Sequence, residues 1–149
     1  MELVLNNPFR VLGLPATAST RDITKRISDL ETFAELGKVK TYPLDLPSLG
    51  ALDRSLEAIK DAARKIEQAE GRLFHSFFWF RAGDSVDELA LDSLAAGNVD
   101  EAVELWDKQL GKKGTKKYTW RLNRGVLRLV RANGGMLDKD EMDEALEDL

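Results

Sequence analysis

The 149-residue sequence contains no cysteine and a single histidine, His75. Without cysteine the chain has no disulfide, no thiolate zinc site, no iron–sulfur cluster and no cysteine nucleophile. With one histidine it has no two-histidine metal site and few routes to general-base catalysis. His75 and Ser76 are adjacent, so on a helix their side chains point ~100° apart, which does not suit a catalytic pair. These absences predict a protein that is not an enzyme.

The sequence also lacks an apolar run that approaches the roughly 20 residues of a membrane-spanning helix. Residues 1–7 have no basic region followed by an apolar one, so they do not resemble a signal peptide. Phosphate-binding glycine motifs and calcium loops are absent as well. We therefore expect a cytoplasmic protein with no membrane segment, no metal site and no cofactor.

The period-two alternation of a half-buried strand is missing too, whereas helical periodicity runs through most of the chain. Residues 38–50 interrupt it with Pro43, Pro47 and Gly50 and are expected to form a loop. The fold class is therefore predicted to be all-α. The expected helices cover residues 7–12, 20–36, 52–66, 72–81, 86–96, 99–110, 118–132 and 138–149.

Two serines stand where helices are expected to begin. Ser19 and Ser85 each lie three positions before an acidic residue, which is the arrangement of a capping box. Around the second start lie four carboxylates that the helix dipole favours: Asp84, Asp87, Glu88 and Asp92. We expect these carboxylates to be solvated rather than to form an acid–base pair.

Five of the eleven aromatic residues fall within seven positions: Phe74, Phe77, Phe78, Trp79 and Phe80. A helix that is apolar on several sides is expected to be buried on several sides. We therefore predict that residues 72–81 form a buried joint between two halves of the chain, with an exposed docking patch as the alternative. The boundary is expected just after this segment, which gives domains 1–82 and 83–149.

Four segments of the first half share the order of a known module. Residues 7–14 are Asn-Pro-Phe-Arg-Val-Leu-Gly-Leu, and residues 16–23 are Ala-Thr-Ala-Ser-Thr-Arg-Asp-Ile. Residues 56–62 are Leu-Glu-Ala-Ile-Lys-Asp-Ala, and residues 70–75 are Glu-Gly-Arg-Leu-Phe-His. Over roughly the first eighty residues the chain resembles the J-domain, the DnaJ-like module of co-chaperones. The resemblance implies a J-domain-like helical bundle whose partner is a heat-shock chaperone.

One departure from that module concerns its functional motif. J-domains carry a His-Pro-Asp tripeptide between the second and third helices, where it triggers ATP hydrolysis in the chaperone. The corresponding positions here are Tyr42, Pro43, Leu44 and Asp45, so the histidine is missing and a leucine separates the other two. The lysine-rich second helix is replaced by residues 20–36, with three basic and four acidic side chains. We therefore expect Tyr42, Pro43 and Asp45 to form a degenerate motif that does not stimulate the chaperone.

The second half resembles another helical family. Residues 95–103, Ala-Ala-Gly-Asn-Val-Asp-Glu-Ala-Val, and residues 123–127, Asn-Arg-Gly-Val-Leu, are similar to parts of successive tetratricopeptide repeats. Ala102 and Gly125 are 23 positions apart, close to the ~22 implied by a 34-residue period. The resemblance implies a short array of helical hairpins. Because about three repeats are needed for independent stability, we expect this array to pack against the aromatic helix, the J-like core or further sequence beyond Leu149.

The net charge of −4 hides a basic segment, since residues 111–131 carry eight basic and no acidic side chains. Four lysines are expected in a loop: Lys112, Lys113, Lys116 and Lys117. Four arginines at helical spacing are expected on one face: Arg121, Arg124, Arg128 and Arg131. This stripe suits phosphates or an acidic protein. Residues 132–149 carry seven acidic side chains, so the first interpretation is that the stripe pairs with this tail or is a solvated helix face.

Together these features predict a non-enzymatic protein–protein interaction module, a chaperone-related adaptor that acts through surface complementarity. The partner is expected to be a heat-shock chaperone or an acidic protein. The alternative is binding of nucleic acid or another polyanion through residues 112–131. Salt separates the two, because polyanion binding weakens steeply as salt rises whereas an apolar interface responds weakly.

Overall fold

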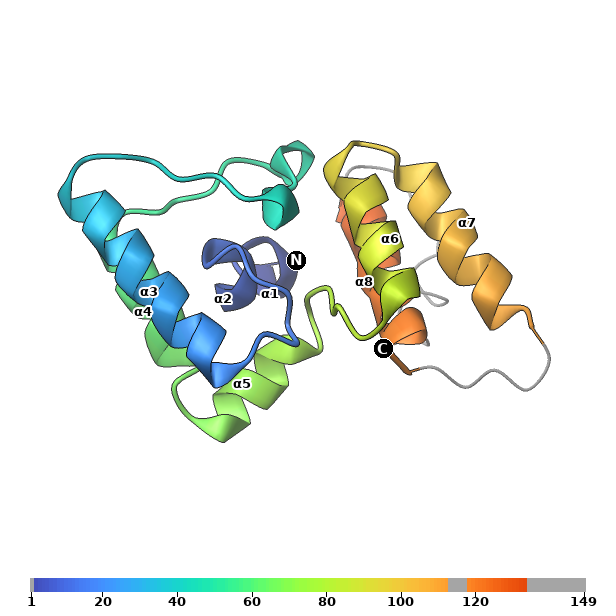
Figure 1. The fold of residues 1–149 in the computed structure, drawn as a ribbon, viewed down its shortest axis with the longest axis horizontal. Coiled ribbons are helices and arrows are strands. Elements are labelled where there is room, and N and C mark those ends of the chain that lie inside the picture. The colour runs from blue at the N-terminus through green and yellow to red at the C-terminus, as the bar shows by residue number, and fades with distance from the viewer. Residues whose placement is uncertain (1, 113–117, 134–149) are drawn as a thin grey trace. The chain divides into compact units, whose positions relative to one another are not determined.

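The computed structural model describes residues 2–112 and 118–133, and all regular structure in these residues is helical. The predicted all-α fold class is thereby confirmed. The expected helix at 138–149 lies outside the described residues. The helices, labelled in Figure 1, are α1 (Glu2–Leu5), α2 (Pro8–Val11), α3 (Thr20–Glu35), α4 (Leu56–Lys65), α5 (Ala69–Ser76), α6 (Ser85–Ala95), α7 (Val99–Leu110) and α8 (Tyr118–Asn133), with 3-10 turns η1 (Pro43–Asp45) and η2 (Pro47–Leu49).

Contacts divide the chain into two compact units. The N-terminal unit comprises residues 2–79, and the C-terminal unit begins at Phe80. The boundary expected from the sequence, between residues 82 and 83, lies three residues further on. Each unit has its own set of buried apolar side chains and is described by itself.

In the N-terminal unit α3 and α4 lie side by side, and α2 packs against α4 and α5 (Figure 1). Phe9 and Leu12, from α2 and its end, are fully buried, as are Leu30 of α3 and Ile59 of α4. Asn7 joins α2 to α5, since its side chain accepts the N–H of Phe9 at 3.0 Å and donates to a carbonyl of α5 at 2.9 Å. Helix α2 thus lies against α4 and α5 through this apolar core.

Local capping chemistry sets the ends of the long helices in this unit. The Ser19 hydroxyl accepts the N–H of Asp22 at 3.1 Å, as the sequence predicts for the start of α3. After the end of α3, Gly37 has φ +68°, a conformation that favours glycine. Helix α4 was expected to begin at Leu52 but begins at Leu56, because the Ser55 hydroxyl caps it by accepting a backbone N–H at 3.2 Å.

The aromatic segment differs from the prediction. Helix α5 ends at Ser76, so the expected helix 72–81 is wrong at its C-terminal end. Phe74 is 50% exposed and Phe77 is 39% exposed, and burial on several sides is therefore also wrong for these two side chains. Trp79 and Phe80 are fully buried, but they follow the helix instead of belonging to it. Because the backbone leaves the helix after Ser76, the five rings do not share one helical arrangement.

In the C-terminal unit α6 and α7 pack as a hairpin, and α8 packs against both. Gly97, predicted to end the first helix of this pair, has φ +85° at the turn. Ala90, Ala102, Trp106 and Val126 are fully buried, so each of the three helices contributes to the core. The Phe80 ring stacks on Trp106 with 6.3 Å between ring centroids.

A buried polar network joins α6, α7 and α8. Asp87 of α6 has no exposed surface, which corrects the expectation that its carboxylate is solvated. Its oxygens accept the N–H of Gly83 at 3.0 Å, Trp106 Nε1–H at 2.9 Å and Asn123 Nδ2–H at 2.9 Å. Asn123 in turn bonds the backbone N–H and carbonyl of Arg81 at 2.6 and 2.7 Å. A buried charge of this kind is tolerated because donors from α7, α8 and the preceding loop surround it.

The start of α6 also differs by one residue from the prediction. Asp84, and not Ser85, is the N-cap, because its carboxylate accepts the N–H of Asp87 at 3.0 Å. The same carboxylate oxygen accepts Trp120 Nε1–H of α8 at 3.0 Å. The cap thereby also ties α6 to α8, a role that the serine hydroxyl does not fill.

Candidate interaction sites

The loop that holds Tyr42, Pro43 and Asp45, predicted to be a degenerate motif, carries one strongly bound carboxylate. Arg54 Nη2 lies 2.5 Å from Asp45 Oδ1, and Arg54 Nη1 donates to Asp45 Oδ2 at 2.7 Å. The second oxygen also accepts the backbone N–H of Tyr42 at 2.9 Å. The Asp45 and Arg54 side chains are 12% and 5% exposed. Both carboxylate oxygens are therefore engaged inside the N-terminal unit.

The Arg10 side chain holds the same loop by binding backbone carbonyls of that loop. This guanidinium is fully buried beside α2 and donates to four carbonyls at 2.7–3.4 Å, those of Leu5, Asp45, Leu46 and Gly50. Burial lowers the pKa of Arg10, the Asp45 carboxylate raises it, and the Arg54 guanidinium lowers it again. An arginine stays charged in such a place, so its planar donors give the loop charge-assisted hydrogen bonds.

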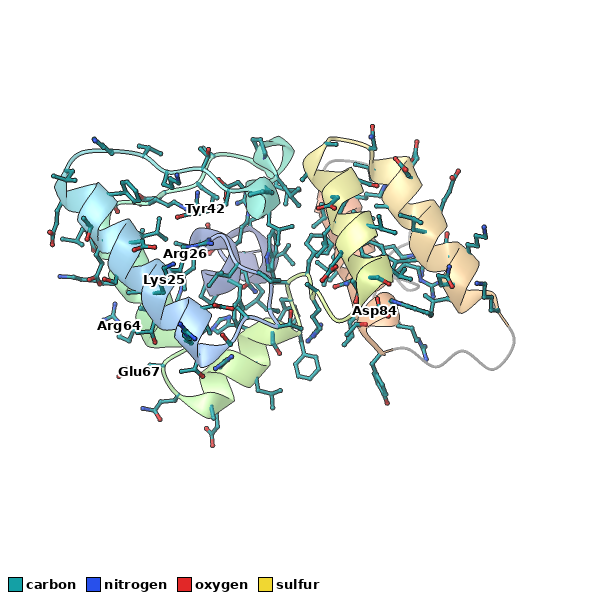
Figure 2. The ribbon with its side chains drawn as sticks, viewed as in Figure 1. Lys25, Arg26, Tyr42, Arg64, Glu67 and Asp84 are labelled. Carbon is teal, nitrogen blue, oxygen red and sulfur yellow. The ribbon has the colours of Figure 1, made fainter. Side chains whose placement is uncertain are left out.

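A third arginine covers the first residue of the motif. The Arg26 guanidinium carbon lies 3.7 Å from the centroid of the Tyr42 ring (Figure 2 labels both residues). The Arg54 guanidinium carbon lies 5.0 Å from the same centroid. Arg26 also donates to the carbonyls of Leu12 and Gly13, both at 2.9 Å. Gly13 has φ +67°, and a Cβ there would overlap the Tyr42 ring. The glycine after α2 is thus required for the ring to sit where it does.

Of the three candidate motif residues, only Pro43 is exposed, while Tyr42 is half-buried and Asp45 is buried. The structure brings Tyr42 and Asp45 together, but it turns them toward α2. Sequence reasoning missed Arg10 and Arg54, which hold the loop. Their contacts to residues 40–50 follow no helical period, and no spacing in the sequence signals them.

The arginine stripe of α8 is paired with α7. Arg124 Nη1 lies 3.2 Å from Asp107 Oδ1, and Arg131 Nη2 lies 3.0 Å from Asp100 Oδ1. The acids are seven residues apart, as are the arginines, and the order is reversed because the two helices run antiparallel. The sequence contains this matched spacing, but sequence reasoning missed it and expected the counter-charge in the acidic tail.

The remaining residues of the basic segment are less fully described. Arg121 and Lys112 are exposed, and Arg128 is half-buried. Lys113, Lys116 and Lys117 lie outside the described residues, as does the acidic tail, so their predicted roles stay predictions. Within the described part, α7 supplies the carboxylates that the stripe binds, which reduces the positive charge that α8 presents to an anion.

The N-terminal unit exposes more large apolar side chains than capping or core packing requires. Leu36 and Val39, which follow α3, are 63% and 84% exposed. Leu73, Phe74 and Phe77 are also exposed, on α5 and at its end. Leu73, Phe74 and Phe77 fall within five positions, and such a cluster of exposed apolar side chains is typical of surfaces that bind other proteins, whereas single exposed ones are ordinary.

The described residues contain no group of three histidine, aspartate or glutamate side chains placed to hold a metal ion. In the same residues no helix has the length and apolar character that crossing a membrane requires. Comparison with protein-family models, with curated proteins and with solved structures gives no match. The J-domain and tetratricopeptide resemblances therefore stay predictions that rest on the sequence motifs.

Proposed function

We propose that this chain is a non-enzymatic protein-interaction module, a co-chaperone-like adaptor in which the J-like half binds but does not trigger ATP hydrolysis. The observation that carries this proposal is the Asp45–Arg54 ion pair in a loop that Arg10 also holds. Freeing the Asp45 carboxylate for a chaperone would break a buried pair, which costs about 3–5 kcal/mol. The loop thus serves as part of the fold, and binding falls to other surfaces of the unit.

The exposed apolar side chains of the N-terminal unit support a protein partner. Phosphates and nucleic-acid backbones are bound by cations, whereas apolar side chains favour a partner that brings apolar surface of its own. A heat-shock chaperone and an acidic protein are the partners that the sequence resemblance and the basic segment suggest. Surface complementarity, without bond chemistry, is the mechanism that these residues support.

The alternative function is binding of nucleic acid or another polyanion through residues 112–131. Eight cations in this segment favour it. The pairing of Arg124 with Asp107 and of Arg131 with Asp100 disfavours it, because a phosphate would have to displace an acid already in place. Protein binding is therefore the first proposal.

Affinity capture with the tagged full-length protein, with and without nuclease, tests the choice. We expect a partner protein to be recovered in an amount near that of the tagged protein. Its recovery should survive nuclease treatment and depend weakly on salt. A variant with Lys112→Glu and Arg121→Glu should recover it equally well, since both residues are exposed on the basic segment. Recovery of nucleic acid that is lost steeply with salt and in this variant would replace the proposal by its alternative.

A further inference from the structure

A groove of about 570 Å³ runs along the N-terminal unit, lined by α3, α4 and the start of α5. Its floor is apolar and is formed by Ile23, Ile27, Ala63, Ile66 and Ala69. Ile23 and Ile66 are buried, and Ile27 and Ala63 are half-buried. The small alanine side chains on the α4 side leave room between the helices, so the groove can receive side chains from outside.

The length of the groove suits a helix. Its α3 side runs from Thr20 to Glu31, which at 1.5 Å per residue is about 17 Å, or three helical turns. Arg72, at the start of α5, donates to the Thr20 hydroxyl at 2.8 Å. The end of α4 therefore lies near the start of α3, and the two helices run antiparallel. Antiparallel helices with an open seam form the surface on which a third helix packs, ridge into groove.

The two rims of the groove differ in charge. On the α4 rim Lys60 and Arg64 are both exposed and lie one turn apart. Lys60 takes part in no ion pair between described residues, and Arg64 holds Asp61 at 3.1 Å in an exposed pair of small strength. The α3 rim offers the hydroxyls of Thr20 and Thr24.

The two acidic residues of the lining lie toward opposite ends of the groove. Glu31 belongs to the last part of α3, and Glu67 follows α4 (Figure 2 labels Glu67 beside Arg64 at the edge of the unit). Glu31 lies on the opposite rim and Glu67 lies three positions beyond Arg64, so no acid of the lining stands between Lys60 and Arg64 on the α4 rim. The middle of that rim is therefore positive, and the floor beside it is apolar.

We propose that this groove binds an amphipathic helix of a protein partner, with an apolar ridge on the groove floor and two carboxylates, one turn apart, against Lys60 and Arg64. The inference rests on the proposed function and deepens it by naming the surface and the chemistry of the partner. The apolar floor excludes a polyanion as occupant, and the basic rim favours an acidic helix over a neutral or basic one.

A displayed library of helical peptides about four turns long tests the proposal on the full-length protein. We expect the selected peptides to carry an apolar row flanked by two acidic residues three or four positions apart. Binding of one such synthetic peptide, read by fluorescence anisotropy, should weaken about tenfold in Lys60→Glu, since an attraction becomes a repulsion. Lys25→Glu makes the same charge change on an exposed α3 residue outside the groove and should leave binding unchanged.

A second variant, Ala63→Leu, fills the groove with a side chain that a helix accepts well. It should abolish peptide binding while thermal unfolding shows that the unit stays folded. Selection of no peptide, selection of basic peptides, or binding unaffected by Ala63→Leu would overturn the groove proposal. If the protein forms a concentration-dependent dimer and Ala63→Leu abolishes it, the groove binds a second copy of this chain instead of a partner helix. If the protein captured from cells is retained by Ala63→Leu, the proposed function stands and the groove is not its site.

Discussion

Arg54 holds Asp45 at two points, with Nη2 2.5 Å from Oδ1 and Nη1 2.7 Å from Oδ2. The same guanidinium donates to the carbonyls of Arg10 at 3.2 Å, Val11 at 2.8 Å and Lys40 at 2.8 Å. One side chain therefore joins the loop after α3 to the end of α2. The aspartate that resembles a chaperone-activating residue is an anchor of the fold in this protein.

Removing that anchor should destabilise the N-terminal unit. We expect Asp45→Ala to lower the free energy of unfolding by about 3–5 kcal/mol, because it leaves the Arg54 guanidinium buried without its carboxylate. Urea denaturation measures this loss. Asp29→Ala, which removes an exposed acid from α3, should change stability by no more than about 0.5 kcal/mol. Equal effects of the two substitutions would show that the pair contributes nothing.

The engaged carboxylate also predicts a negative result with the chaperone. Because both oxygens of Asp45 are bound, we expect the protein not to accelerate ATP hydrolysis by a bacterial heat-shock chaperone. A single-turnover assay, with an intact J-domain protein as positive control, measures this. Stimulation as strong as that of the control, and lost on Asp45→Asn, would contradict the proposed function.

The carboxylate of Asp87 should be needed for the C-terminal unit to fold stably. Asp87→Ala removes the acceptor of three donors, of which those of Trp106 and Asn123 are buried, and each buried donor left unsatisfied costs about 1–3 kcal/mol. Trp106→Phe removes one of these donors and also leaves a cavity in the core, so it should be destabilising as well. Glu88→Ala, at the neighbouring exposed position, is the matched control and should have little effect. Tryptophan fluorescence during urea unfolding follows all three variants.

The partial exposure of Phe77 contradicts the burial that the aromatic cluster predicts from the sequence. Phe77→Ala should cost about 1–2 kcal/mol, because a side chain that is 39% exposed loses only part of the burial that a core ring loses on truncation. Phe9→Ala in the same unit should cost about 3–5 kcal/mol, since that ring is fully buried. Thermal unfolding compares the two. If Phe77→Ala lowers the melting temperature as far as Phe9→Ala does, the original prediction that residues 72–81 form a buried joint would be favoured again.

The one histidine makes stability depend on pH in a known direction. Burial lowers the pKa of His75, Lys65 lowers it further, and Nδ1 has no hydrogen-bond partner among the described residues. The unfolded chain, with a histidine pKa of about 6.5, then binds the proton more tightly than the folded one. Stability should be constant above about pH 6.5 and fall as pH drops through the lowered value. His75→Gln should flatten the dependence below about pH 6.5, and an unchanged slope there would contradict it.

What the sequence predicts well is local. Helical periodicity predicts an all-α fold, and Ser19, Gly37 and Gly97 mark helix ends because a cap needs only its nearest neighbours. The error at Asp84 and Ser85 arises because two capping residues stand side by side and the choice depends on Trp120, 36 residues away. The end of α5 was missed because no glycine or proline follows Ser76 to mark it.

What the sequence does not predict depends on distant partners. Arg10 meets carbonyls 35 to 40 residues away, and no periodic pattern relates them. In the sequence Asp87 resembles a solvated acid of the first helical turn, whereas in the structure α8 places Asn123 in hydrogen-bond contact with it. In the same way the loop at Tyr42 and Asp45 is located by its resemblance to a motif, whereas its inward orientation follows only from Arg54. The candidate site is thus predicted in position and not in role.

The loop between α3 and α4 is fixed by its main chain, since Arg10 binds the carbonyls of Asp45, Leu46 and Gly50. Every residue type has a carbonyl, so the side chains at exposed positions such as Pro47 are not what Arg10 recognises. The spacing between those carbonyls is recognised instead. One residue inserted between Leu46 and Gly50 would move an acceptor away from the guanidinium, whereas several substitutions would leave all of them in place. This stretch of the chain therefore constrains the number of its residues more tightly than their identity.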